Sequence, residues 1–292
     1  PAHNTVCVDG VSSYPVMMSQ HGFSSADMAE GDNSTYSQVS FVEPETQSDQ
    51  LRTNGIIKTS DNGGYYVDIF RSRRQDGKDK FHDYFYHNLG QTMTLTAADG
   101  TDLNLQPTEE LAFAGGHLYA YSYIYNKVNA TTDKDVRATF TVKSNEGRDI
   151  YMNMWMKGYA DRDVFSALSP VNMEYERMKN EPYDIDKQPV LTYVARQKGE
   201  AWTHPFVAIF EPSDTNEPSE IESVSFFEPE VAANKPNYFH KSDDAVGIIV
   251  RLKNGATDYI FSSPQAMEMR YKGMKVKGKY AVIRDGNKLI EK

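Results

Sequence analysis

The sequence predicts an all-β fold, a large antiparallel β-sandwich followed by a small C-terminal β-unit. Short segments that alternate apolar and polar residues recur along the 292 residues. Sequences rich in Gly, Asn and Asp, which favour tight turns, separate many of these segments. The chain also contains 19 Tyr and 14 Phe, and aromatic residues favour pleated surfaces. Many strands with short connections indicate an antiparallel sandwich.

Strands are expected wherever alternation is bounded by turn residues, and the opening residues His3–Val8 already alternate in this way. The next expected strands are Thr35–Glu43, Gly55–Thr59, Gly64–Ser72, Phe81–His87, Gln91–Thr96, His117–Asn126, Val136–Lys143 and Asp149–Lys157. The later ones are Val190–Arg196, Phe206–Glu211, Ile221–Phe227, Ala245–Leu252, Thr257–Ser263 and Lys279–Arg284.

Gly-containing turns are expected to close hairpins between several of these strands. They are Asp61–Gly64, Ala98–Gly100, Asn145–Gly147, Lys253–Gly255 and Asp285–Asn287. One segment differs, because Ser169 is a suitable helix N-cap and Pro170 suits the first helical position. A short helix is therefore predicted over Val171–Asn180.

A Pro-, Ser- and acid-rich connector, EPSDTNEPS at Glu211–Ser219, indicates a boundary between two units. We expect a β-sandwich domain over residues 1–211 and a small β-unit over residues 212–292. The length is sufficient for one large all-β domain or two smaller ones.

The net charge of −10 and the pI near 5.2 argue against a nucleic-acid partner. No apolar run approaches the roughly 20 residues of a membrane helix, so no membrane partner is expected. A single cysteine, Cys7, permits no internal disulfide. The chain opens without an initiator Met or a signal peptide.

The densest chemistry lies in Tyr65–Gly90, YYVDIFRSRRQDGKDKFHDYFYHNLG. His82 and Tyr84 share one strand face and form a usable acid–base pair, so with Arg71 they are catalytic candidates. Arg71 is expected to pair with Asp68 or Asp83 or to bind an anion. His82 and His87 face opposite sides of a strand and are not expected to share an ion. Taken alone, these residues favour the structural interpretation, in which they are satisfied polar groups that bridge two sheets.

A second candidate is the tyrosine ladder of HLYAYSYIY, in which Tyr119, Tyr121, Tyr123 and Tyr125 would share one strand face. Such a ladder could stack on sugars, which makes Tyr119, Tyr121 and Tyr123 candidate substrate-binding residues. Cross-strand aromatic packing is the alternative.

Four stretches together resemble the C-terminal β-sheet region of the heparinase II/III-like polysaccharide lyases. They are AHNTVCVDG (2–10), YYVDIFRSRRQDGKDKFHDYFYH (65–87), RQKGEAWTHPFVAIFEP (196–212) and VGIIVRLKNGATDYIF (246–261). The resemblance implies a sandwich of the lyase super-sandwich type. It also implies an acidic polysaccharide as partner, β-elimination next to a uronate carboxylate, and a secreted, periplasmic or cell-surface location.

The resemblance further matches His3 to one zinc ligand of zinc-containing relatives. The other ligands of those relatives, and the α-helical toroid that carries the catalytic Tyr and Asn, have no counterpart here. We therefore expect the chain to lack an N-terminal α-toroid domain. No cofactor is expected in this chain, although a full-length protein could hold zinc, because a structural zinc needs four ligands or three plus water.

Three functions remain open at this point. The chain is the C-terminal β-domain of a polysaccharide lyase, inactive without its toroid; or it is a free-standing carbohydrate-binding or scaffolding β-sandwich module; or it is a small enzyme using His82, Tyr84 and Arg71. Whether it is an enzyme by itself, which polysaccharide is cut and the oligomeric state are not predicted by the sequence.

Overall fold

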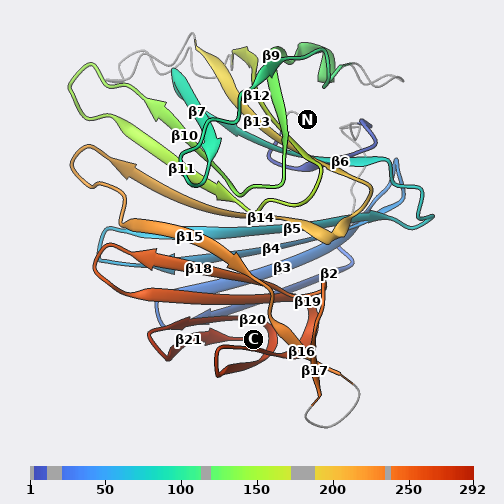
Figure 1. The fold of residues 1–292 in the computed structure, drawn as a ribbon, viewed down its shortest axis with the longest axis vertical. Helices are drawn as coiled ribbons and strands as arrows, with labels where there is room; N and C mark the ends of the chain where they lie inside the picture. Colours follow the sequence, from blue (N-terminus) through green and yellow to red (C-terminus); the bar gives the residue numbers. More distant parts are fainter. Residues whose placement is uncertain (1–2, 12–21, 113–119, 172–187, 234–237) are drawn as a thin grey trace.

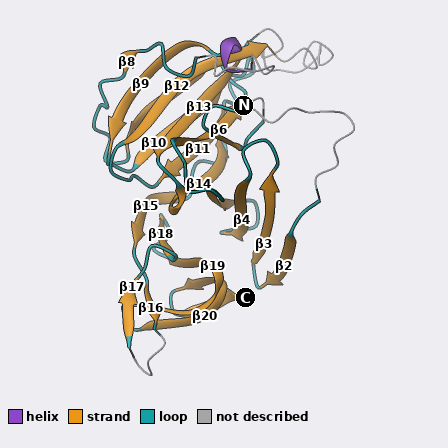
Figure 2. Ribbon diagram, turned by 90° about the vertical axis from the view of Figure 1, so that its right-hand side faces the viewer, coloured by secondary structure: helices purple, strands orange, loops and turns teal. Residues whose placement is uncertain are grey.

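A computed structural model describes residues 3–11, 22–112, 120–171, 188–233 and 238–292. These residues form three antiparallel sheets stacked in layers, with an eight-stranded sheet in the middle (Figure 1). Viewed from the side, the six-stranded sheet lies at one end of the molecule and strands β19 and β20 lie at the other (Figure 2). The predicted all-β antiparallel fold is confirmed.

Within each sheet the spatial order of the strands differs from their order in the sequence. The six-stranded sheet contains, from edge to edge, β1 (Val6–Val8), β6 (Phe81–Asn88), β13 (Pro189–Lys198), β12 (Arg162–Val171), β9 (Tyr125–Thr132) and β8 (Gln106–Pro107). The eight-stranded sheet contains β2 (Ser25–Gly31), β3 (Ser34–Glu43), β4 (Ser48–Lys58), β5 (Gly64–Arg74), β14 (Ala201–Asp214), β11 (Ile150–Met156), β10 (Val136–Val142) and β7 (Thr92–Ala97).

The third sheet has seven strands and contains all of the regular structure after Asp214. Its main path is β15 (Ile221–Phe227), β18 (Val246–Leu252), β19 (Thr257–Tyr271), β16 (Glu230–Ala232) and β17 (Phe239–Lys241), with β20 (Met274–Arg284) pairing β19 and β21 (Asn287–Glu291) pairing β20. The described residues contain one helical element, the 3-10 helix η1 (Ala120–Tyr123).

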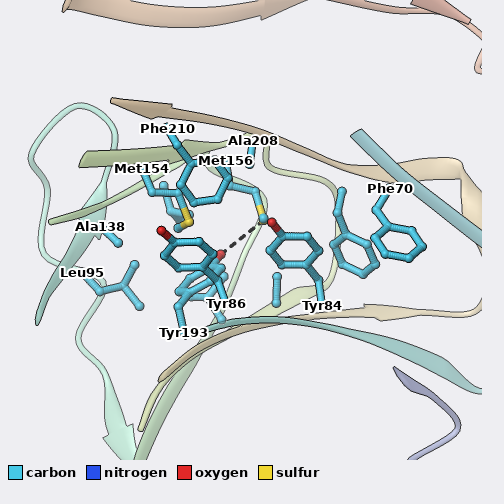
Figure 3. Packing of buried hydrophobic residues seen from close by; sticks show 14 of the residues in the cluster. Phe70, Tyr84, Tyr86, Leu95, Ala138, Met154, Met156, Tyr193, Ala208 and Phe210 are labelled. Carbon is cyan, nitrogen blue, oxygen red and sulfur yellow. Dashed lines mark hydrogen bonds between the residues drawn. The ribbon is translucent and has the colours of Figure 1, made fainter. Parts of the chain in front are cut away.

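The core between the six- and eight-stranded sheets is rich in aromatic side chains and methionine. Tyr84, Tyr86 and Tyr193 of the six-stranded sheet pack on Phe206 and Phe210 of β14 (Figure 3). The Tyr193 hydroxyl donates to the sulfur of Met156 across this interface at 3.4 Å. The alternating tyrosines of HDYFYH therefore face inward, as the period of a strand requires.

A second core joins the eight-stranded sheet to the seven-stranded sheet. Tyr65, Val67 and Ile69 of β5 contribute to it from one side, and Ile248 and Ile260 contribute from the other. The central strands β5 and β14 of the eight-stranded sheet are thus buried on both faces. The predicted division at residues 211 and 212 stays a prediction, and β14 runs through it without a break.

The predicted helix is wrong at its start, because Ser169, Pro170 and Val171 lie in β12, and residues 172–180 lie outside the described residues. The register between β12 and β13 shifts between Ser169 and Val171, so Pro170 occupies a bulge. A bulge is one of the few positions in a sheet where proline costs no ladder hydrogen bond. The Ser169-Pro170 pair is therefore as compatible with the end of a strand as with the start of a helix.

Gly55 on β4 provides a test of the packing between the eight- and seven-stranded sheets. A methyl group there would overlap the hydroxyl of Tyr280, which is fully buried, has no hydrogen-bond partner among the described residues and stacks on Tyr36. We expect Gly55→Ala to lower the free energy of unfolding by about 1–3 kcal/mol, the usual cost of overpacking. Denaturant unfolding measures this loss.

Two further variants make the result specific to this contact. Gly22→Ala should be nearly neutral, because no described atom lies within 4 Å of its added methyl group. Tyr280→Phe removes the overlapping hydroxyl and should recover part of the stability lost in Gly55→Ala. Equal stabilities of Gly55→Ala and the parent chain would contradict this packing.

Candidate functional site

The three catalytic candidates do not share one site: His82 and Tyr84 contact the face of β5 that is turned to the six-stranded sheet, whereas Arg71 lies on its other face. His82 is fully buried on β6 and faces the eight-stranded sheet, where its Nδ1 lies 3.0 Å from the Ser72 hydroxyl. Its Nε2 lies 2.8 Å from Asp79 Oδ1 in the β5–β6 turn. A carboxylate can only accept, so Nε2 carries the proton and Nδ1 accepts from Ser72. This imidazole therefore links β6 of the six-stranded sheet to β5 of the eight-stranded sheet and to the connection between them.

Tyr84 is also fully buried and donates to Asp68 Oδ2 at 2.8 Å. Arg52 holds the same carboxylate with two parallel hydrogen bonds of 2.8 and 2.6 Å, and Asn54 donates to it at 3.0 Å. Burial and the negative charge of Asp68 raise the pKa of Tyr84 well above its ordinary value. The hydroxyl is therefore neutral and is occupied as a donor.

Arg71 does not pair with Asp68 or Asp83, so the expected pairing is wrong, and binding of an anion stays a prediction. Its guanidinium, only 2% exposed, donates to the backbone carbonyls of Trp202 and Asp244. Asp68 already binds Arg52, and Asp83 binds Arg196 on the opposite side of the six-stranded sheet. Burial lowers the pKa of Arg71 to about 10. As catalytic residues, His82, Tyr84 and Arg71 stay predictions.

The expected strand over the tyrosine ladder is wrong for residues 120–123, and among the described tyrosines of the ladder only Tyr125 lies in a strand, at the start of β9. Residues 120–123 form η1, whereas Tyr119 lies outside the described residues. Tyr121 is 1% exposed, but Tyr123 is 63% exposed, so the two do not form one stacking surface. A turn with three residues per repeat does not keep alternate residues on one face. As substrate-binding residues, Tyr119, Tyr121 and Tyr123 stay predictions.

The outward face of the six-stranded sheet, which points away from the other two sheets, holds a second buried carboxylate. Asp83 of β6 is fully buried, and Arg196 of β13 binds it through two hydrogen bonds of 2.7 and 2.9 Å. Tyr121 donates to Asp83 at 2.7 Å, and Glu110 accepts from Arg196 at 3.0 Å. The Arg196 guanidinium also lies 3.9 Å above the ring of Phe81.

This outward-face network could not be found from the sequence, which gave Arg196 no role. Asp83 and Arg196 are direct cross-strand partners in the β6–β13 register, and registers between distant strands are not visible in a sequence. Burial alone would lower the pKa of Arg196, but Asp83 raises it above the ordinary value. The guanidinium therefore stays charged beside the exposed Glu110 carboxylate.

A polar corner lies on the same outward face, at the end of β6. His87 points outward, opposite to His82 as predicted, and its Nδ1 lies 3.0 Å from the Thr192 hydroxyl. The Ser169 hydroxyl lies 2.7 Å from the same Thr192 oxygen. Asn4 accepts the backbone N–H of His87 at 2.7 Å, which places the N-terminal residues beside this corner. A half-buried imidazole with hydroxyl neighbours is suited to bind sugar hydroxyls.

His3 directly precedes Asn4, which lies beside this corner, and the His3 side chain is exposed. Among the described residues, no group of three or more His, Cys, Asp and Glu side chains is arranged to hold a metal ion. One imidazole does not complete a zinc site, so the described residues do not fit this metal by themselves. His3 as a zinc ligand stays a prediction.

Comparison with known proteins gives one informative similarity. No model of a known protein family matches the chain. The chain is 32% identical over 246 residues to an endo-acting ulvan lyase of Formosa agariphila. The similarity covers 81% of this chain but 27% of that lyase, so the chain spans about a quarter of its relative's length. In the described residues, no helix is long and apolar enough to cross a membrane.

The Asp83 network supports a prediction about stability. Arg196→Met should lower the free energy of unfolding by about 3–5 kcal/mol, because it leaves a fully buried carboxylate without its cation. Lys143→Met is the matched control, since Lys143 pairs with Asp149 at an exposed site, where solvent screens the two charges and little stability depends on the pair. Similar losses in both variants would contradict a structural role for Arg196.

His82 supports a prediction about pH. Burial lowers its pKa from the ordinary 6.5, and the opposing effect of Asp79 is smaller. The unfolded chain therefore binds a proton at a higher pH than the folded chain does, so stability should fall as pH drops below about 6.5. The His82→Gln variant has no imidazole at this position, so the part of the stability loss that comes from protonating His82 should be absent.

The control for this titration is His204→Gln, which removes an imidazole whose side chain is 47% exposed. It shows what the loss of an exposed histidine does to the free energy of unfolding. The measurement is denaturant unfolding at a series of pH values. If His82→Gln follows the parent curve between neutral and mildly acidic pH, then His82 is not buried as a neutral group.

Proposed function

We propose that this chain is the β-sandwich portion of a polysaccharide lyase of the heparinase II/III-like kind, which cleaves uronate-containing polysaccharide by β-elimination. The observation that carries the proposal is the similarity to an endo-acting ulvan lyase over 81% of the chain. The three-layered antiparallel fold agrees with the sandwich that the lyase resemblance implies. An acidic polysaccharide is the substrate class, and a location outside the cytoplasm follows from the size of such polymers.

In β-elimination a base removes the proton next to the uronate carboxylate, and an acid protonates the leaving glycosidic oxygen. The C–H and C–O bonds break, a C=C bond forms, and no water is consumed. His82, Tyr84 and Arg71 are buried and have protein partners, which favours structural roles for them. We propose that the base and the acid are supplied by the toroid of a longer polypeptide.

The outward face of the six-stranded sheet is the proposed wall of the substrate groove. In the polar corner, the half-buried His87 and Ser169 side chains would meet sugar hydroxyls, and the fully buried Thr192 hydroxyl positions both. The nearby Arg196 presents a charged guanidinium that is fixed by Asp83 and stacked on Phe81, and its side chain is 10% exposed. This chain would thus bind and orient the polymer, while the reacting groups lie on the opposite wall.

The 292-residue chain alone should release no unsaturated uronate from ulvan, heparan sulfate or alginate, whereas the native polypeptide that carries it should do so. Ultraviolet absorbance of the unsaturated product measures both. Product from neither protein, together with retained polysaccharide binding, would favour a carbohydrate-binding module. Product from the chain alone that is lost in His82→Ala would favour the small-enzyme interpretation.

A further inference from the structure

A cleft between the eight-stranded and seven-stranded sheets has the composition of an anion-binding site. It has a volume of about 460 Å³, within the range of small-ligand sites, about 300–1,000 Å³. Strands β3 and β4 form one side, the β19 segment around Pro264–Met267 forms another, and Arg73 and Trp202 form the end. Because the six-stranded sheet packs on the opposite face of the eight-stranded sheet, this cleft is separate from the proposed groove.

An arginine and a tryptophan define the end of the cleft. The Arg73 guanidinium lies 4.3 Å above the ring of Trp202, and its side chain is 50% exposed. Its closest carboxylate contact is with Asp49 at 3.6 Å, which leaves hydrogen-bonding capacity on the guanidinium for a ligand. Indole rings and guanidinium groups are well suited to contact sugar rings and their anionic substituents, respectively.

The lining of the cleft carries two cations, Arg73 and Lys279, and one carboxylate, that of Asp244, although the chain as a whole carries −10. Two carboxylates outside the lining contact these cations: Asp49 lies 3.6 Å from Arg73, and Asp27 lies 3.2 Å from Lys279. Behind this wall lies the buried Arg71, which donates to the carbonyls of Trp202 and Asp244. In the part of the chain that the structure describes, no carboxylate lies within ion-pair distance of Arg71, so its charge adds to the field in the cleft.

A larger groove at the opposite ends of β5 and β14 has a more acidic lining and provides the contrast. It measures about 870 Å³ and is lined by Arg148 and Lys253, but also by four acidic side chains. These are Glu211, Asp214, Glu217 and Glu220. An acidic polymer is repelled by that lining and attracted to the smaller cleft, so charge rather than volume selects between them.

We propose that the Trp202 cleft binds an anionic sugar unit of an acidic polysaccharide, as a secondary site away from the groove where the polymer is cut. Arg73 and Lys279 contact the carboxylate or sulfate group, and Trp202 supports the sugar ring. The identity of the sugar rests on the proposed function, whereas anion binding rests on the cleft itself. Such a site would hold a long polymer while another part of it is cleaved.

Calorimetric titration of the 292-residue chain tests the proposal with three probes. Alginate oligosaccharides carry carboxylates, dextran sulfate oligosaccharides carry sulfates, and dextran oligosaccharides carry neither. We expect one or both anionic probes to bind, with an affinity that falls as salt rises, and dextran to bind at least about tenfold more weakly. Which anionic probe binds distinguishes carboxylate from sulfate recognition. Equal binding of dextran would overturn the proposal.

Matched variants then locate the site. Arg73→Gln/Lys279→Gln should weaken binding about tenfold, equivalent to about 1.4 kcal/mol. Arg73→Lys/Lys279→Arg, which keeps both charges, should bind within about threefold of the parent chain. Lys143→Gln/Arg148→Gln removes the same charge elsewhere, and Arg148 lines the larger groove. Loss of binding in this last variant but not in the first would overturn the assignment.

Binding and cleavage separate this proposal from the proposed function. If the native polypeptide forms unsaturated product and the cleft variants bind like the parent chain, only the cleft proposal fails. If the cleft binds acidic oligosaccharides as described but no uronate polymer is cleaved, the cleft proposal stands and the lyase proposal fails.

Discussion

A buried aspartate held by an arginine and a tyrosine recurs in all three layers of this protein. Asp68 lies between the six- and eight-stranded sheets with Arg52 and Tyr84. Asp258 lies between the eight- and seven-stranded sheets, where Arg284 binds it at 2.6 and 2.7 Å and Tyr65 donates to it at 2.6 Å. Asp83, with Arg196 and Tyr121, occupies the outward face.

The networks of Asp68 and Asp258 follow from the position of β5 in the eight-stranded sheet, where the sheet is covered on both faces. Polar groups in such a sheet must be satisfied by protein partners, because water does not reach them. On β5, Tyr65 faces one core and Asp68 faces the other, and each finds its partners on a neighbouring sheet or strand. The same arrangement, an aspartate bound by an arginine and a tyrosine, thus fixes how neighbouring layers sit relative to one another.

Much of the fold could be predicted from the sequence, because alternation and turn residues are local properties. The strands around Gly64–Ser72, Phe81–His87 and Val136–Lys143 were expected nearly where they lie. The extent of β19 was underestimated, since it continues through a bulge after Ser262. Strand β2, which is mostly exposed, was missed because it lacks an apolar alternation.

The candidate site was harder to predict, because it depends on pairings between distant residues. The alternation of tyrosines in HLYAYSYIY is compatible with a strand. In the structure, however, Tyr121 lies in a 3-10 helix, and its hydroxyl donates to Asp83, which is distant in the sequence. Strand periodicity alone was enough to predict that His82 and His87 face opposite sides of one strand and do not share an ion. The partners of Arg71 could not be inferred from the sequence, because they are backbone carbonyls, which every residue has.

The two-sided burial of the central strands of the eight-stranded sheet should make the three layers one cooperative unit, and this is our central claim. Native-state hydrogen exchange measures it directly, because it gives a free energy of opening for each amide. We predict that amides of β5 and β14 in the eight-stranded sheet and of β18 and β19 in the seven-stranded sheet exchange with the same free energy, that of global unfolding. Opening of β18 and β19 at a free energy several kcal/mol lower would contradict this claim and would show that the C-terminal sheet unfolds as a separate domain.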